Sequence, residues 1–129
     1  MSKTKKIGLI IFIIIVILTA LGVYFYIQIN DGLENLENIV IEDIDLSTVE
    51  DGTYTGEYTQ TPLSVIVQVE VFDHEIVNIL ILKHDNGQGN PAEVIINSVI
   101  ASQSIDVDSI AGATYSSIVI LLAIQDALS

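Results

Sequence analysis

Cysteine and arginine are both absent from this chain of 129 residues, and only four lysines supply positive side-chain charge. Without cysteine there is no disulfide, thiolate zinc site, iron–sulfur cluster, catalytic thiol or lipid-modified cysteine. Three lysines (Lys3, Lys5 and Lys6) lie before the first hydrophobic run. Residues 30–129 combine 17 acids with Lys83 alone, for a formal charge of −16. Because Lys and Arg supply most of the affinity for phosphate backbones, we expect no nucleic acid partner.

A hydrophobic run without any ionised side chain covers residues 7–29. About 20 such residues in a helix cross a hydrocarbon core of about 30 Å. Tyr24 and Tyr26 fall near one end, where amphipathic rings favour the membrane interface, and the leading lysines favour a cytoplasmic N-terminus. We therefore expect a cytoplasmic tail at residues 1–6, a single-pass transmembrane helix in the lipid of the cell membrane and an extracytoplasmic remainder. A cleaved signal peptide is the alternative, although "TALG" matches a cleavage site poorly.

An acidic connector, "NDGLENLENIVIEDIDLSTVED", covers residues 30–51. Leu33, Leu36 and Val40 are spaced like a short helical stripe, but the density of charge is typical of a solvated segment. The sequence therefore predicts a solvated stalk that holds the following domain off the bilayer.

Residues 52–129 predict a small α+β domain in which a small antiparallel sheet packs against two helices. Strands are expected at residues 53–59, 64–72 and 76–83, and in the second of them valine alternates with other residues. Its Val65, Val67, Val69 and Val71 should share one face. The third strand is apolar on both faces, which predicts a central position in the sheet. Asp73, His74 and Glu75 should form the hairpin turn, with His74 at a left-handed position.

The predicted helices follow a loop at residues 84–89, "HDNGQG". Asn90 as N-cap, Pro91 in the first turn and Glu93 as a capping acid indicate the start of a helix that ends near Ser102. A last helix is expected at residues 116–128. A domain of about 80 residues buries only about 60% of its unfolded surface. We therefore expect an open surface site and not an enclosed cavity.

The stretch "DSIAGATYSS" at residues 108–117 carries the strongest chemical signal. Three residues with almost no side chain precede three hydroxyls: Ala111, Gly112 and Ala113, then Thr114, Ser116 and Ser117. The start of a helix offers unpaired N–H groups to an anion, small residues let that anion approach the backbone, and the three hydroxyls would form a ring around it. A phosphate held only by dipoles on so acidic a surface would bind weakly. The simpler interpretation is that Ser116 or Ser117 caps the helix and the small residues allow tight packing.

"DVDSIAGATYSS", followed by a helix of Ile, Ala and Leu, resembles the signature of the FMN-binding domain family. Three flanking segments resemble the same family: "DGTYTGEY" its opening strand, "VIVQVEVFDHEIVNILIL" its hairpin and "HDNGQG" its loop before the first helix. The resemblance covers residues 51–129. The family includes domains of the sodium-pumping quinone reductase and small extracytoplasmic electron carriers.

The resemblance implies that Thr114 carries FMN through a phosphoester made by a flavin transferase, which uses FAD and magnesium. Asp108 matches the motif's leading acid. The implied function is that of a membrane-anchored extracytoplasmic electron carrier with membrane-associated donor and acceptor, more than that of an enzyme with its own substrate. Two departures stand out: Ala111 replaces a frequent serine, and the hairpin turn lacks the frequent glycine.

Two alternatives to this function remain. The domain could bind FMN without a covalent bond, or it could be a flavin-free interaction module on an acidic stalk. Other chemistry is weakly indicated: His74 and His84 have no clear third metal ligand, and the pair Asp106 and Asp108 lacks the glycine and glutamate of a calcium loop. No His/Asp arrangement suggests a nucleophilic serine.

Overall fold

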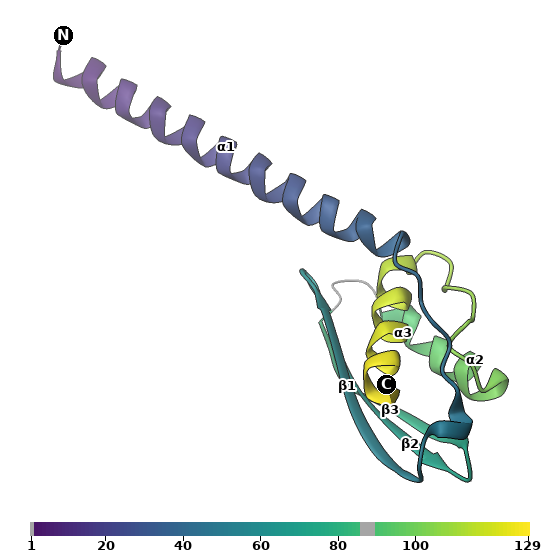
Figure 1. Cartoon of the computed structure of the whole chain (residues 1–129). Helices are drawn as coiled ribbons and strands as arrows, with labels where there is room; N and C mark the ends of the chain where they lie inside the picture. Colours follow the sequence, from purple (N-terminus) through teal and green to yellow (C-terminus); the bar gives the residue numbers. More distant parts are fainter. Residues whose placement is uncertain (1, 86–89) are drawn as a thin grey trace. The chain divides into compact units, whose positions relative to one another are not determined.

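The structure, a computed structural model, describes residues 2–85 and 90–129, and the chain divides into two compact units at residues 1–32 and 33–129. The long helix α1 (Lys3–Glu37) forms the first unit, and its last residues belong to the second (Figure 1). Within the described residues, α1 is the one helix long and apolar enough to cross a membrane, by length and composition. The apolar side chains of its residues 7–29 are exposed, which agrees with the predicted transmembrane helix.

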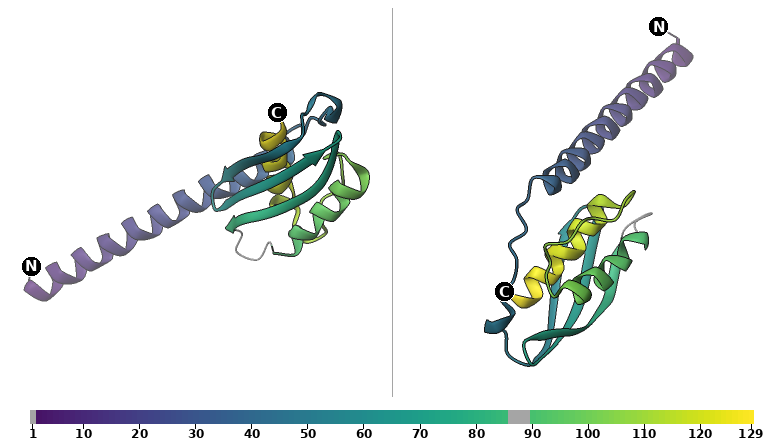
Figure 2. Two further views of the ribbon diagram at one scale, coloured as in Figure 1. Left: turned by 90° about the horizontal axis from the view of Figure 1, so that it is seen from below. Right: turned by 90° about the vertical axis from the view of Figure 1, so that its right-hand side faces the viewer.

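The second unit is an α+β domain with one sheet and two helices. Its elements are η1 (Leu46–Thr48), β1 (Gly52–Gln60), β2 (Leu63–Phe72), β3 (Glu75–Asp85), η2 (Asn90–Val94), α2 (Ile95–Ser102) and α3 (Thr114–Leu128), where η marks a 3-10 helix. The sheet is antiparallel with the strand order β1-β2-β3. Both α-helices lie on one face of it, α3 over β1 and β2 and α2 over β3 (Figure 2). This architecture confirms the predicted fold class.

The central strand is β2, and its alternating sequence divides between the two faces of the sheet. Val65, Val67 and Val69 are each 0% exposed beneath the helices, as predicted. The prediction that the third strand is central is wrong, because β3 lies at an edge of the described sheet. Its second apolar row faces solvent, with Leu80 48% and Leu82 55% exposed. The presence of apolar residues on both faces of β3 therefore does not indicate a central position in the sheet.

Gly56 lets α3 pack directly against the backbone of β1. A Cβ atom at this position would collide with the carbonyl oxygen of Ala123 and the backbone nitrogen of Ala127, and would lie 2.7 Å from the Ala127 Cβ. A glycine inside a strand often marks such a close approach. Beside it, the Asp126 carboxylate accepts a hydrogen bond of 3.0 Å from the Glu57 N–H. These contacts fix α3 on the sheet.

Asp73 and His74 form the turn between β2 and β3. Their φ angles of 51° and 60° confirm the predicted left-handed position of His74. Glu75 belongs to β3 and not to the turn. The Nδ1 atom of His74 lies 3.1 Å from the Leu46 carbonyl oxygen and 3.2 Å from that of Val49. With its proton on Nδ1, this ring ties the hairpin to the segment before β1.

The segment predicted as a solvated stalk packs onto the domain from Leu33 onward. Leu36 is 1% exposed and Val49 is 7% exposed, and both belong to the hydrophobic core. Four more side chains of the segment pack against this core: Leu33, Ile41, Ile44 and Leu46. Residues 33–51 are therefore more than a solvated spacer, because most of their apolar side chains join the core while their acidic side chains are exposed. Apolar residues recur through the acidic run, and burying them stabilises the packed arrangement while the acids stay at the surface.

The two predicted helices differ from expectation at their starts. Residues 90–94 form η2, so the first turn is the tighter 3-10 type and the α-helix begins at Ile95, whereas its predicted end at Ser102 is confirmed. Helix α3 begins at Thr114, earlier than the predicted Ser116. The predicted loop at residues 84–89 begins within β3, and residues 86–89 lie outside the described residues, as do the side chains of the expected cap at residues 90 and 91.

Candidate functional site

A tight turn at residues 110–113 leads into α3. The Ala113 N–H donates a hydrogen bond of 2.9 Å to the Ile110 carbonyl oxygen. Gly112 has φ = 78°, the value that a type II turn requires at its third residue and that glycine adopts without strain. A Cβ atom at Gly112 would meet nothing within 4 Å. Gly112 therefore serves the backbone conformation of an open turn, and tight packing does not explain it.

Thr114 is the first residue of α3 and is partly exposed. The residue before it, Ala113, is the N-cap and makes no side-chain cap hydrogen bond. The first-turn N–H groups of a helix have no partner inside the helix, and the helix dipole favours negative charge there. Within the described part of the chain, no hydrogen bond engages the Thr114 hydroxyl. An accessible hydroxyl thus lies at an uncapped helix start.

Ser116 and Ser117 lie differently from the predicted ring of hydroxyls. Ser116 is 4% exposed and Ser117 is 0% exposed. The Ser117 hydroxyl donates a hydrogen bond of 2.7 Å to the Ala113 carbonyl oxygen and accepts one of 3.0 Å from the Ile110 N–H. Ser117 therefore bonds both ends of the turn from beneath. Neither the predicted contact with an anion nor a cap on the helix N–H groups describes this role.

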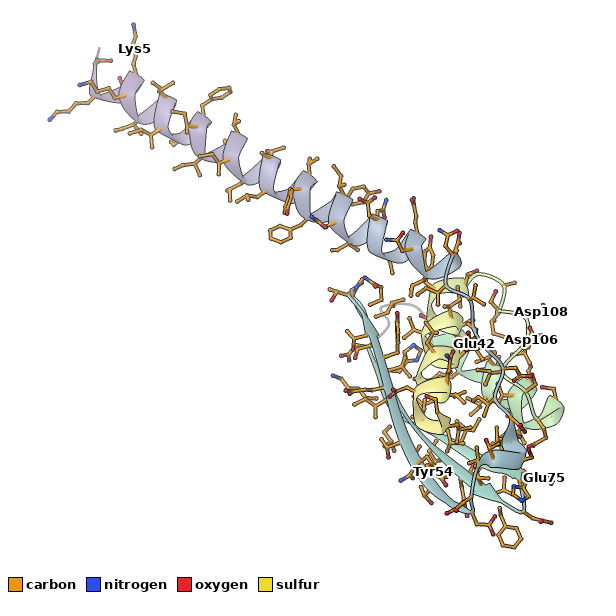
Figure 3. The ribbon with its side chains drawn as sticks, in the orientation of Figure 1. Lys5, Glu42, Tyr54, Glu75, Asp106 and Asp108 are labelled. Carbon is orange, nitrogen blue, oxygen red and sulfur yellow. The ribbon has the colours of Figure 1, made fainter. Side chains whose placement is uncertain are left out.

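Asp106 and Asp108 are exposed on the segment that runs from α2 to the turn (Figure 3). The Asp106 N–H donates a hydrogen bond of 3.0 Å to the Ser104 hydroxyl oxygen. That hydroxyl donates to Asp43, at 2.7 Å, and the second oxygen of Asp43 accepts from the Ile105 N–H at 3.1 Å. The segment that carries the motif's leading acid is thereby fastened to the connector.

The Asp43 carboxyl is the group whose acidity this network changes most clearly. The hydrogen bond from the Ser104 hydroxyl lowers the pKa of Asp43 below its ordinary value. The N–H groups of Ile44 and Ile105 lower that pKa further, whereas partial burial opposes them. The ionised form of Asp43 is therefore the form that the folded domain favours.

The one lysine of residues 30–129 is distant from the turn in sequence and forms an ion pair with another residue. Lys83 is the one basic residue in residues 30–129, and its Nζ lies 3.3 Å from an Asp85 oxygen at the end of β3. A phosphate at the turn would thus rely on helix N–H groups and hydroxyls. The open Gly112, the uncapped start of α3 and the accessible Thr114 hydroxyl fit such a group.

The two histidines have other positions. His74 lies against carbonyl oxygens of the connector, and His84 Nδ1 lies 3.1 Å from a Glu93 carboxylate oxygen. Among residues 2–85 and 90–129, no three side chains of the metal-binding types come together. The histidines are thus part of the contacts between elements of the domain.

Sequence reasoning missed three polar residues that hold the site in place. They are Asp43, Gln103 and Ser104. Gln103 ends α2 with φ = 54°, and its side-chain amide bonds both the N–H (2.6 Å) and the carbonyl oxygen (2.9 Å) of Ile76 at the start of β3. Their partners lie far along the chain, so no local pattern signals them. For Ser117, the available signal was its spacing of four residues from Ala113, at which a serine hydroxyl bonds back to a helix carbonyl.

Comparison with known families identifies the domain. The family model of the FMN-binding domain matches residues 59–129, which is more than half of the chain. The matched range runs from the end of β1 to the last residue and includes the turn and Thr114. No curated protein matches the chain. The chain belongs to the FMN-binding domain family, and FMN is its cofactor.

Proposed function

We propose that this protein is a membrane-anchored extracytoplasmic electron carrier whose FMN is attached to Thr114 through a phosphoester. One observation carries the attachment site: Thr114 presents a hydroxyl at the uncapped start of α3, directly after the open Gly112 turn. Ser116 and Ser117 are buried, and the Ser117 hydroxyl is engaged on both sides. Of the three aliphatic hydroxyls that follow the turn, that of Thr114 is therefore the accessible one.

The attachment step is a phosphoryl-type transfer with FAD as the donor. The Oγ1 atom of Thr114 forms a bond to the phosphorus of the FMN half of FAD, and the P–O bond of the pyrophosphate bridge breaks. AMP leaves, and the hydroxyl proton passes to a base of the flavin transferase. No electron is gained or lost, so the step needs no oxidant or reductant. The required partners are FAD as the donor and the magnesium-dependent transferase as the catalyst.

The charge of the domain favours a covalent bond over simple binding. Residues 30–129 carry a formal charge of −16, and Lys83, their one basic residue, pairs with Asp85. A helix start at the surface contributes about 1 kcal/mol to holding an anion. That is too little to retain a flavin outside the cell against dilution. A phosphoester removes the need for electrostatic attraction.

The residues around Thr114 serve access and recognition in this proposal. Ala111 and Gly112 are exposed, which leaves the turn open to the active site of a transferase. Asp108 is exposed on the approach to the turn and is the recognition acid. The N–H groups of the first turn of α3 lie next to Thr114 and favour the negative charge of the phosphodiester. When bound, FMN supplies the electron-transfer chemistry, and the protein supplies position and local electrostatics.

The long apolar helix supports a location of this chemistry at a membrane. In this proposal α1 spans the lipid bilayer with Lys3, Lys5 and Lys6 in the cytoplasm, and the domain of residues 33–129 faces outward. Electron donor and acceptor are then membrane-associated proteins on the same side. The domain relays electrons between them and has no substrate of its own.

In-gel fluorescence tests the covalent bond against simple FMN binding. The full chain is expressed together with a flavin transferase, purified in detergent, denatured and run on a gel. Flavin fluorescence should stay with the denatured wild-type chain and vanish in Thr114→Val, which keeps β-branching but removes the nucleophilic oxygen. Thr55→Val, at an exposed threonine of β1, is the matched control and should stay fluorescent. Flavin that absorbs in the native protein but is lost on denaturation would favour non-covalent binding.

A further inference from the structure

The turn before Thr114 has no support at its tip. Ala111 and Gly112 are exposed, and a Cβ atom on Gly112 would meet nothing within 4 Å. Packing against the tip therefore cannot hold the turn in one conformation. Whatever fixes the direction in which Thr114 leaves the turn must act at the base, which is formed by Ile110 and Ala113.

Ser117 supplies the hydrogen bonds at that base. Its hydroxyl accepts from the Ile110 N–H at 3.0 Å and donates to the Ala113 carbonyl oxygen at 2.7 Å, and its own N–H also bonds that carbonyl at 3.0 Å. The side chain is 0% exposed, so water does not compete for these bonds. One buried hydroxyl thus joins both ends of the turn to the first turn of α3.

We propose that Ser117 is a positioning residue for the flavinylation of Thr114. It holds the turn at residues 110–113 so that Thr114, the next residue, is presented to the transferase in a single conformation. This inference rests on the proposed attachment of FMN to Thr114. Ser117 itself is buried and contacts neither FMN nor the transferase.

The hydrogen bonds of Ser117 predict a specific kinetic signature. Without the hydroxyl, the partly buried Ile110 N–H loses its partner and the turn samples further conformations. The transferase then binds only the competent fraction, so the apparent affinity for the protein substrate falls by that fraction. Once the transferase has bound the domain, the Thr114 hydroxyl reacts as it does in the wild type. Ser117→Ala removes both hydrogen bonds of the hydroxyl, so it should raise KM for the protein several-fold and leave kcat within about twofold.

The experiment measures initial rates of flavinylation for the full chain in detergent micelles with purified transferase and FAD. Ser117→Cys keeps the size of the side chain but donates and accepts more weakly, so its KM should lie between those of the wild type and Ser117→Ala. Ser116→Ala removes the neighbouring buried hydroxyl and should keep the wild-type KM. Val99→Ala weakens the core beneath α2, away from the turn, and should lower the thermal midpoint without changing KM.

Each outcome supports or overturns the positioning role of Ser117 or the proposed attachment of FMN to Thr114. A raised KM with unchanged kcat in Ser117→Ala, together with an intermediate Ser117→Cys, supports the positioning role. A wild-type KM in both variants overturns it, and so does a KM in Val99→Ala that rises as it does in Ser117→Ala. If Ser117→Ala does not fold, Ser117→Cys alone carries the comparison. Absence of any adduct on wild-type Thr114 overturns the proposed function first and this inference with it.

Discussion

The Asp43 carboxylate accepts a hydrogen bond of 2.7 Å from the Ser104 hydroxyl, which lies 61 residues further along the chain. The other oxygen of Asp43 accepts from the Ile105 N–H at 3.1 Å. Because Ser104 also accepts from the Asp106 N–H, the connector is joined to the segment that leads to the turn at residues 110–113. The connector is thus a structural part of the domain.

This network predicts a pH-dependent contribution to stability. The pKa of Asp43 is lowered in the folded protein, chiefly by the Ser104 hydroxyl. Its contribution is therefore fully present above the unfolded pKa of about 4 and is lost as the pH falls through the lower folded pKa. Asp43→Asn should lower the thermal midpoint of the full chain in detergent at pH 7, and the difference from the wild type should shrink below about pH 4.

Glu42→Gln is the matched control for that measurement, because it removes the same charge from an exposed neighbouring residue. It should leave the thermal midpoint at pH 7 close to that of the wild type. A difference between wild type and Asp43→Asn that persists unchanged at pH 2, or that is absent at pH 7, would contradict the assigned network.

Two glycines should respond to alanine in different ways. Gly56→Ala places a Cβ atom against backbone atoms of Ala123 and Ala127, which cannot move without shifting α3, so we expect a loss of about 3 kcal/mol or more. Gly112→Ala meets open space and costs about 1–2 kcal/mol for the left-handed backbone alone. Urea unfolding of the full chain, followed by the near-UV circular dichroism of its tyrosines, measures both. Equal losses at the two positions would refute the close approach of α3 to β1.

Much of the fold follows from local patterns in the sequence. Valine occupies every second position of β2, and successive side chains of a strand point to opposite faces, so the buried face was predictable. The turn at Asp73 and His74 was predictable because only three residues separate the two strands that the sequence predicts. The apolar helix at residues 7–29 was predictable from length and lack of charge alone. The FMN-binding motif at residues 108–117 was found through its resemblance to the family, because its residues alone are equally compatible with a simple helix cap.

The remainder depends on contacts between distant parts of the chain. Leu36 and Val49 belong to an acidic run in the sequence but are buried in the core of the domain. The charge density of that run does not reveal that its apolar side chains contact the core. Gln103 bonds Ile76 across 27 residues, which no helical or strand period predicts. The edge position of β3 was missed because apolar residues on both faces were taken to require cover on both sides, whereas one of its faces is open.

The proposed topology predicts which part of the chain a protease reaches. Protease added to intact cells or spheroplasts should digest residues 33–129 and spare the membrane-embedded helix, since the lysines before residue 7 favour a cytoplasmic N-terminus. A cytoplasmic protein serves as the control for intact membranes. Protection of the domain until the membrane is breached would reverse the orientation.

The mass of the chain and of its peptides after expression with a flavin transferase tests the central claim most directly. The account predicts one FMN-sized adduct on the wild-type chain, located on the peptide that contains Thr114. Thr114→Val should carry none, and Thr114→Ser should retain part of it because the hydroxyl survives. Because a hydroxyl at a helix start contributes only about 1 kcal/mol, Thr114→Val should keep its fold. No adduct on the wild type, or an adduct that persists on Thr114→Val at Ser116 or Ser117, would contradict the account.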